Sequence, residues 1–265
     1  MQRAKVRSIR RFLTGDACYR PETFARGYVW TAPELAQLLI DLEDNARTEF
    51  HRPSRESLYL GVMTAAPGRR GSEFYLFDGL QRALAITMIL AFARDRLPFG
   101  YERARLNRML FRKSLFGRAR ARIGLYGDEH DFLVRHILSP DATLQLPRSA
   151  EDGGARRILM SARFLHRAFQ AFSADRIREL LDALLDRSAV VVSVCPPHEI
   201  GAAVSRARML APPPVEREQP PAPVMSITPR KIAVSTDAET LRPRKPRRDT
   251  RSQHPGSPDY RPHAE

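Results

Sequence analysis

The stretch YLFDGLQRALAI, residues 75–86, is the feature that most constrains how this chain can fold. It begins as a short apolar strand and ends as an apolar helix, so the chain must turn within the few polar residues between them. Asp78 is a residue type that caps helices, Gln81 completes an Asp-x-x-Gln capping box, and Gly79 permits a tight turn. The junction therefore predicts a strand, a capped turn and a helix over residues 79–96.

Arg82 is the residue of this junction that capping does not explain. Its cation falls in the first helical turn, where the helix dipole disfavours positive charge. The free N–H groups at a helix start attract anions, and the planar donor fork of arginine suits phosphate. Two interpretations stay open: a turn that only caps a helix, or a phosphate site in which Asp78 holds a ribose hydroxyl or Mg²⁺.

The remaining pattern up to residue 210 predicts an α+β fold. Thr31 and Glu34 form a capping box at the start of a helix whose apolar residues lie on one face, and Ser173 is a candidate cap for a later helix. The other expected elements are a helix at 8–13, an extended segment at 18–30, strands at 57–66 and 73–77, helical patterns at 158–172 and 177–185, and strand-like segments at 121–126 and 189–195.

Composition indicates the class of protein and divides the chain. Of the 265 residues 43 % are apolar, enough for a sizeable core, and the two cysteines show no metal or disulfide spacing. No signal core and no run of about 18 apolar residues is present, which predicts a cytoplasmic protein without a membrane partner. Residues 211–265 are rich in proline and arginine and poor in large apolar side chains, which predicts a disordered tail.

The formal net charge of +14 favours polyanionic partners, DNA among them. Only four of the 44 basic residues are lysine, and a GC-rich genome also produces such an arginine bias, so charge alone is a weak indication. The seven histidines show no metal-ligand spacing such as HExxH. We therefore predict no nuclease centre in this chain.

Several motifs follow one another in a specific order before residue 90. An arginine and two aromatics precede the helix capped by Thr31, a Leu-Gly pair lies in the next strand, and Asp-Gly-x-Gln-Arg begins the following helix. This order resembles the N-terminal domain of GmrSD-type restriction endonucleases, with their QR-x-Y-x-W segment, LG strand and DGQQR motif. The resemblance spans roughly residues 8–195, and the matching residues are Arg26, Tyr28, Trp30, Leu60, Gly61, Asp78, Gly79, Gln81 and Arg82.

The resemblance implies a ParB/sulfiredoxin-like mixed sheet with helices over residues 1–100 and a mainly helical continuation over 101–210. In that family the DGQQR loop is associated with nucleoside triphosphate binding and hydrolysis, and the proteins defend bacteria against phage, including by cleaving DNA with modified bases. Carried over by position, Arg26, Asp78, Gly79, Gln81 and Arg82 would line the nucleotide site, with Mg²⁺ as a second cofactor and with Asp78 and Arg82 acting in hydrolysis. We assign Tyr28 and Trp30 to the core rather than to base stacking.

The chain also departs from the family pattern. Ala25 and Leu80 stand where the family has glutamine, and Ala83, Leu84 and Ala85 stand where it usually has Leu-Thr-Thr. Several hydrogen-bonding groups are therefore missing around the proposed pocket, which leaves hydrolysis open. Three hypotheses follow. The chain is a nucleotide-binding regulatory domain of a modification-dependent restriction system whose nuclease lies on a partner subunit, or a non-catalytic DNA-binding ParB-like module, or an inactive, truncated or frame-shifted fragment.

Overall fold

The computed structural model describes residues 3–22, 27–47, 58–68, 71–114, 117–151 and 153–196. Arg26 and the tail predicted over 211–265 lie outside these residues. The chain divides into two units, Met1–Pro213 and Pro214–Glu265, and every described residue belongs to the first.

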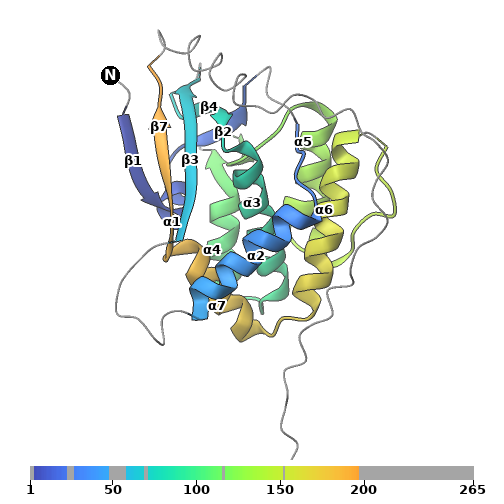
Figure 1. The fold of residues 1–265 in the computed structure, drawn as a ribbon. Helices are drawn as coiled ribbons and strands as arrows, with labels where there is room; N and C mark the ends of the chain where they lie inside the picture. Colours follow the sequence, from blue (N-terminus) through green and yellow to red (C-terminus); the bar gives the residue numbers. More distant parts are fainter. Residues whose placement is uncertain are drawn as a thin grey trace, which may run out of the picture. The chain divides into compact units, whose positions relative to one another are not determined.

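A five-stranded mixed sheet forms one layer of this unit (Figure 1). Its strand order is β1-β7-β3-β4-β2, in which β1 pairs antiparallel with β7, β7 parallel with β3, β3 antiparallel with β4, and β4 parallel with β2. The β3–β7 register shifts between Tyr59 and Val62, so Leu60 and Gly61 form an irregularity in the centre of the sheet. The strands are β1 Arg3–Ser8, β2 Cys18–Pro21, β3 Leu58–Pro67, β4 Glu73–Asp78 and β7 Ser188–Val194.

Helices α2, α3 and α6 lie beside one another on one side of the sheet (Figure 1). Helix α3 is buried on nearly all sides because 14 of its 17 residues are buried, as expected of a helix at the centre of a domain. The helices are α1 Ile9–Thr14, α2 Ala32–Arg47, α3 Leu80–Arg96, α4 Tyr101–Leu110, α5 Gly127–Leu133, the π-helix η2 Val134–Leu138, the 3₁₀ helix η3 Ala142–Leu144, α6 Gly153–Gln170 and α7 Ala174–Leu185.

The predicted α+β class is confirmed, and most predicted elements are found close to their expected bounds. The Glu34 carboxylate accepts the backbone N–H of Thr31 at 2.8 Å, which is one half of the predicted capping box. The Ser173 hydroxyl accepts the N–H of Arg176 at 3.2 Å and caps α7 as expected.

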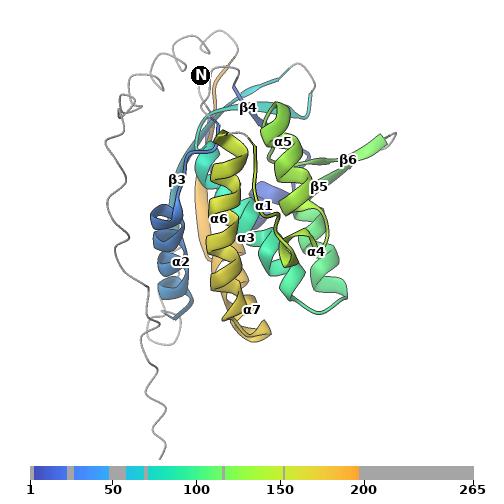
Figure 2. The ribbon, with the colours of Figure 1, turned by 90° about the vertical axis from the view of Figure 1, so that its right-hand side faces the viewer.

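One expectation about the middle of the chain was wrong. The segment 121–126 is not a strand, since its only pairing beyond Ala121 is one isolated bridge between Ile123 and Tyr19. The chain instead forms a hairpin, β5 Phe111–Ser114 with β6 Gly117–Ala121, which projects from the helical layer (Figure 2). None of the described helices is long and apolar enough to cross a membrane.

Candidate functional site

The junction between β4 and α3 holds the residues singled out in the sequence. Gly79 links the two elements with a positive φ of 87°, and a Cβ there would lie 2.8 Å from Met63 Cγ and 3.2 Å from the Val62 carbonyl oxygen. Only glycine allows this backbone conformation and this close approach to β3. The start of α3 is therefore held tightly against the central strand of the sheet.

The first turn of α3 presents unused backbone donors. The first helical hydrogen bond runs from the Ala83 N–H to the Gly79 carbonyl at 3.0 Å. Among the described residues, the N–H groups of Leu80, Gln81 and Arg82 have no acceptor in any recorded hydrogen bond. These three donors and the positive end of the helix dipole favour an anion at this place.

The predicted Asp78–Gln81 capping box is wrong. Asp78 is exposed, and its carboxylate accepts the N–H of the adjacent Gly79 at 2.7 Å, while no side chain caps α3. The Gln81 amide instead reaches the segment before α2: its oxygen accepts the Val29 N–H at 2.8 Å and its nitrogen donates to the Gly27 carbonyl at 2.9 Å. Both ends of Gln81 are thus occupied by backbone, which makes it a positioning residue.

The Arg82 guanidinium lies against Gly61, inside the irregularity of β3. A Cβ on Gly61 would lie 2.5 Å from Arg82 Nη1 and 3.1 Å from Cζ, and Gly61 has a positive φ of 90°. Among the described residues no carboxylate pairs with Arg82, which is half-buried. A cation without a counter-ion at a helix start is the arrangement that the sequence indicated, and Gly61 makes room for it.

The aromatic residues of the FARGYVW segment belong to the core. Tyr28 is fully buried, which raises its pKa well above the usual range, and Trp30 packs partly buried against the core cluster. Their assignment to the core is confirmed. Arg26 itself lies outside the described residues, but Gln81 holds Gly27, its neighbour in the chain, beside the first turn of α3.

The candidate site fits a magnesium–phosphate group better than a free metal ion. The described residues contain no group of three or more His, Cys, Asp or Glu that could hold a metal. Asp78 offers a single exposed carboxylate with one oxygen already engaged by Gly79. Mg²⁺ commonly binds through one carboxylate together with substrate phosphates and waters, so Asp78 could hold it only alongside a nucleotide.

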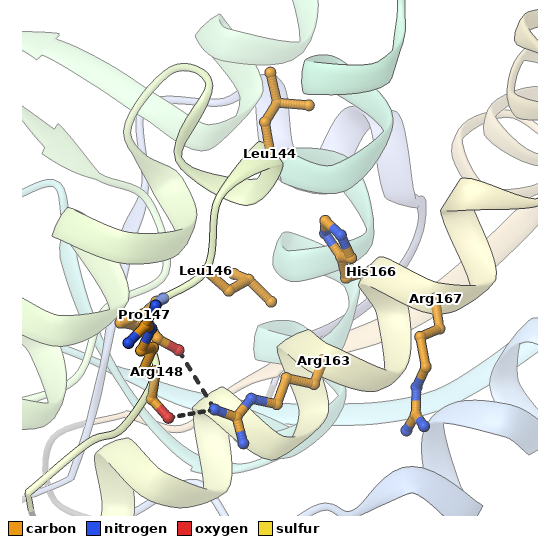
Figure 3. Close-up of a pocket in the computed structure, with 7 residues that line it drawn as sticks. All are labelled: Leu144, Leu146, Pro147, Arg148, Arg163, His166 and Arg167. Carbon is orange, nitrogen blue, oxygen red and sulfur yellow. Dashed lines mark hydrogen bonds between the residues drawn. The ribbon is translucent and has the colours of Figure 1, made fainter.

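A pocket lies on α6, away from this junction in the sequence. A pocket of about 470 Å³ opens between α6 and the segment after η3, and its lining residues are Leu144, Leu146, Pro147, Arg148, Arg163, His166 and Arg167 (Figure 3). Sequence reasoning did not identify it. The available signal was the composition of α6, which carries four arginines and no Asp or Glu.

A buried ion pair at the end of α3 fixes the wall of this pocket. The Arg94 and Asp95 side chains are 1 % and 0 % exposed and pair at 2.6 Å. The Asp95 carboxylate accepts the Thr143 N–H and hydroxyl at 3.2 and 2.8 Å, and the Thr143 carbonyl contacts His166 Nδ1 at 2.9 Å. Helix α3 therefore carries the candidate phosphate site at its start and, at its end, the ion pair that fixes the pocket wall.

No known protein family matches the chain, and no curated protein matches it either.

Proposed function

We propose that the start of α3 binds the phosphate groups of a nucleoside triphosphate. The observation that carries this proposal is the Arg82 guanidinium, which lies against Gly61 and has no carboxylate partner among the described residues, on the same helical turn that presents three backbone N–H groups without acceptors. The exposed Asp78 carboxylate is available to a magnesium ion held by the same phosphates. Gly61 leaves room for the Arg82 guanidinium, and Gly79 lets the start of α3 approach β3 closely.

The wider role that we propose is a nucleotide-binding regulatory domain of a bacterial modification-dependent restriction system. The ordered motifs that resemble GmrSD-type N-terminal domains support this role, and the nuclease would lie on a partner subunit. Gln81 supports binding by holding the backbone of Gly27 and Val29 beside the phosphates. Asp78 and Arg82 are the residues that would act in hydrolysis, if the bound nucleotide is hydrolysed.

Calorimetric titration of the full chain with each nucleoside triphosphate, with and without Mg²⁺, tests this proposal. A hydrogen bond to a charged group contributes about 1.5–3 kcal/mol, so Arg82→Ala should weaken binding about 10- to 150-fold. Arg135→Ala removes an exposed arginine from η2 and should leave binding unchanged. If no triphosphate binds at millimolar concentration, or if the two variants behave alike, the proposal fails.

A further inference from the structure

The exposed face of α6 carries a stripe of arginines. Arg156, Met160, Arg163, Arg167 and Gln170 recur at helical spacing and are all exposed. Neither α6 nor the segment 144–148 that faces it contains an Asp or Glu. A stripe of arginines along one helix is the electrostatic footprint of a surface that contacts a linear polyanion.

The charges of this stripe are not neutralised within the described part of the chain. Arg163 donates to the carbonyl oxygens of Pro147 at 3.4 Å and Arg148 at 2.5 Å, which are neutral partners, so its charge is retained. Figure 3 shows Arg163 reaching from α6 toward that segment, whereas the Arg167 side chain points away from Pro147 and Arg148. For Arg148 and Arg167 the described residues provide no salt bridge.

The geometry favours a phosphodiester backbone as the ligand. Arg163 and Arg167 are four residues apart, about 6 Å along the helix axis, within reach of successive phosphates of one strand. Guanidinium forks match phosphate oxygens, and Arg148 adds a third cation from the opposite wall of the pocket. The apolar side chains of Leu144 and Leu146 line the same pocket and offer a surface to the uncharged sugar and base.

We propose that the α6 stripe, with Arg148 across the pocket, is a nucleic-acid interface that binds the phosphate backbone without reading the sequence. This interface is separate from the triphosphate site at the start of α3 and does not depend on it. The buried Asp95 network holds the opposite wall by fixing Thr143, the residue before Leu144. The interface is therefore built into the folded unit.

Fluorescence anisotropy of the full chain with a labelled single-stranded 20-mer, between about 50 and 300 mM salt, tests the interface. Each phosphate contact contributes about 0.7 to the slope of log K against log salt for a single strand. Losing two contacts in Arg163→Ala/Arg167→Ala should make the slope shallower by about 1.4. With unchanged affinity at 1 M salt, that corresponds to about 25-fold weaker binding at 0.1 M.

Two further variants control for folding and for net charge. Arg167 is exposed on α6, so Arg167→Ala should fold normally and reduce the slope by about 0.7. Arg11→Ala/Arg135→Ala removes the same charge from exposed positions on α1 and η2 and should leave the slope unchanged.

Three results would contradict the proposed nucleic-acid interface. The first is an equal change in slope for the α6 pair and for the control pair. The second is equal binding of poly-L-glutamate of matched charge with an equal loss in the α6 pair, which would indicate an acidic peptide as the ligand. The third is loss of triphosphate binding in the α6 pair with oligonucleotide binding intact. The titration of Arg82→Ala separates the two proposals, because that variant should bind the oligonucleotide normally.

Discussion

Asp95 provides the sharpest test of the energetics of this fold. Its carboxylate is fully buried and accepts four hydrogen bonds: from Arg94 Nε at 2.6 Å, the Asp141 N–H at 3.1 Å, the Thr143 N–H at 3.2 Å and the Thr143 hydroxyl at 2.8 Å. It is both the counter-ion of a buried arginine and the anchor of the loop after η2. Replacing it removes both roles at once.

The expected loss follows from the burial of the pair. Asp95→Ala leaves the Arg94 cation, 1 % exposed, without its carboxylate, and breaking a buried ion pair in this way costs about 3–5 kcal/mol. For a folded unit of this size 1 kcal/mol shifts Tm by about 2–4 °C, so Tm should fall by about 6–20 °C. Asp95→Asn keeps the shape of the side chain but removes its charge and turns an N–H donor toward other donors. The loss of stability in this variant should therefore be similar.

Urea and thermal unfolding of the full chain, followed by circular dichroism, measure these losses. Asp44→Ala is the matched control, because the Asp44 side chain is 70 % exposed on α2, and it should stay within about 0.5 kcal/mol of wild type. A loss below about 1 kcal/mol in Asp95→Ala would refute the assigned role. A cooperative wild-type transition would also count against the hypothesis of an inactive fragment.

Three further changes test the candidate site and its surroundings by urea unfolding. Gly61→Ala should cost about 1–3 kcal/mol, because alanine is strained at a φ of 90° and its Cβ would meet the Arg82 guanidinium. Gln81→Ala should cost about 1–3 kcal/mol through loss of its two hydrogen bonds to the segment 27–29. Burial lowers the pKa of His130, so the folded chain binds fewer protons than the unfolded chain. Stability should therefore fall as the pH drops below about 6.5, and His130→Gln should reduce that dependence.

Each of these changes has its own control or contrary outcome. Gly71→Ala places a Cβ in open space and should be nearly neutral, so equal losses at Gly71 and Gly61 would contradict the crowding argument. Gln37→Ala removes a surface hydrogen bond from the exposed Gln37 to Asp41 on α2 and should cost less than Gln81→Ala. An unchanged pH dependence in His130→Gln would show that His130 is not held neutral by the fold.

Sequence patterns correctly predicted the features that depend on interactions between residues close together in the chain. The Ser173 cap and the Thr31–Glu34 pair lie within one helical turn, and both were found where the spacing placed them. The same spacing rule failed at Asp78 because Gly79 adopts a left-handed conformation and Asp78 bonds to the next N–H instead. Gln81 was free to bond 52 and 54 residues away, which no local rule describes.

The features that sequence reasoning missed depend on contacts between distant segments. Asp95 lies in the run Ala-Arg-Asp-Arg, which has the composition of a solvated helix end, yet the loop containing Thr143 folds over it and buries it. The pocket on α6 likewise requires the segment after η3 to lie against the helix. Only the absence of acidic residues from α6 was visible beforehand, and it indicated a charged surface without showing what faces it.

The segment 27–30 connects the two proposed sites. Gln81 on α3 binds the backbone of Gly27 and Val29, and the Ser161 hydroxyl on α6 donates to the Trp30 carbonyl at 3.2 Å. Helix α3 is buried on nearly all sides and cannot shift without disturbing the core. This segment is one physical connection between the two proposed sites, and any coupling through it would be reciprocal, with each ligand changing the affinity of the other by the same factor. Such coupling requires two arrangements of the segment, and a change in hydrogen exchange at the Val29 amide on nucleotide binding would reveal them.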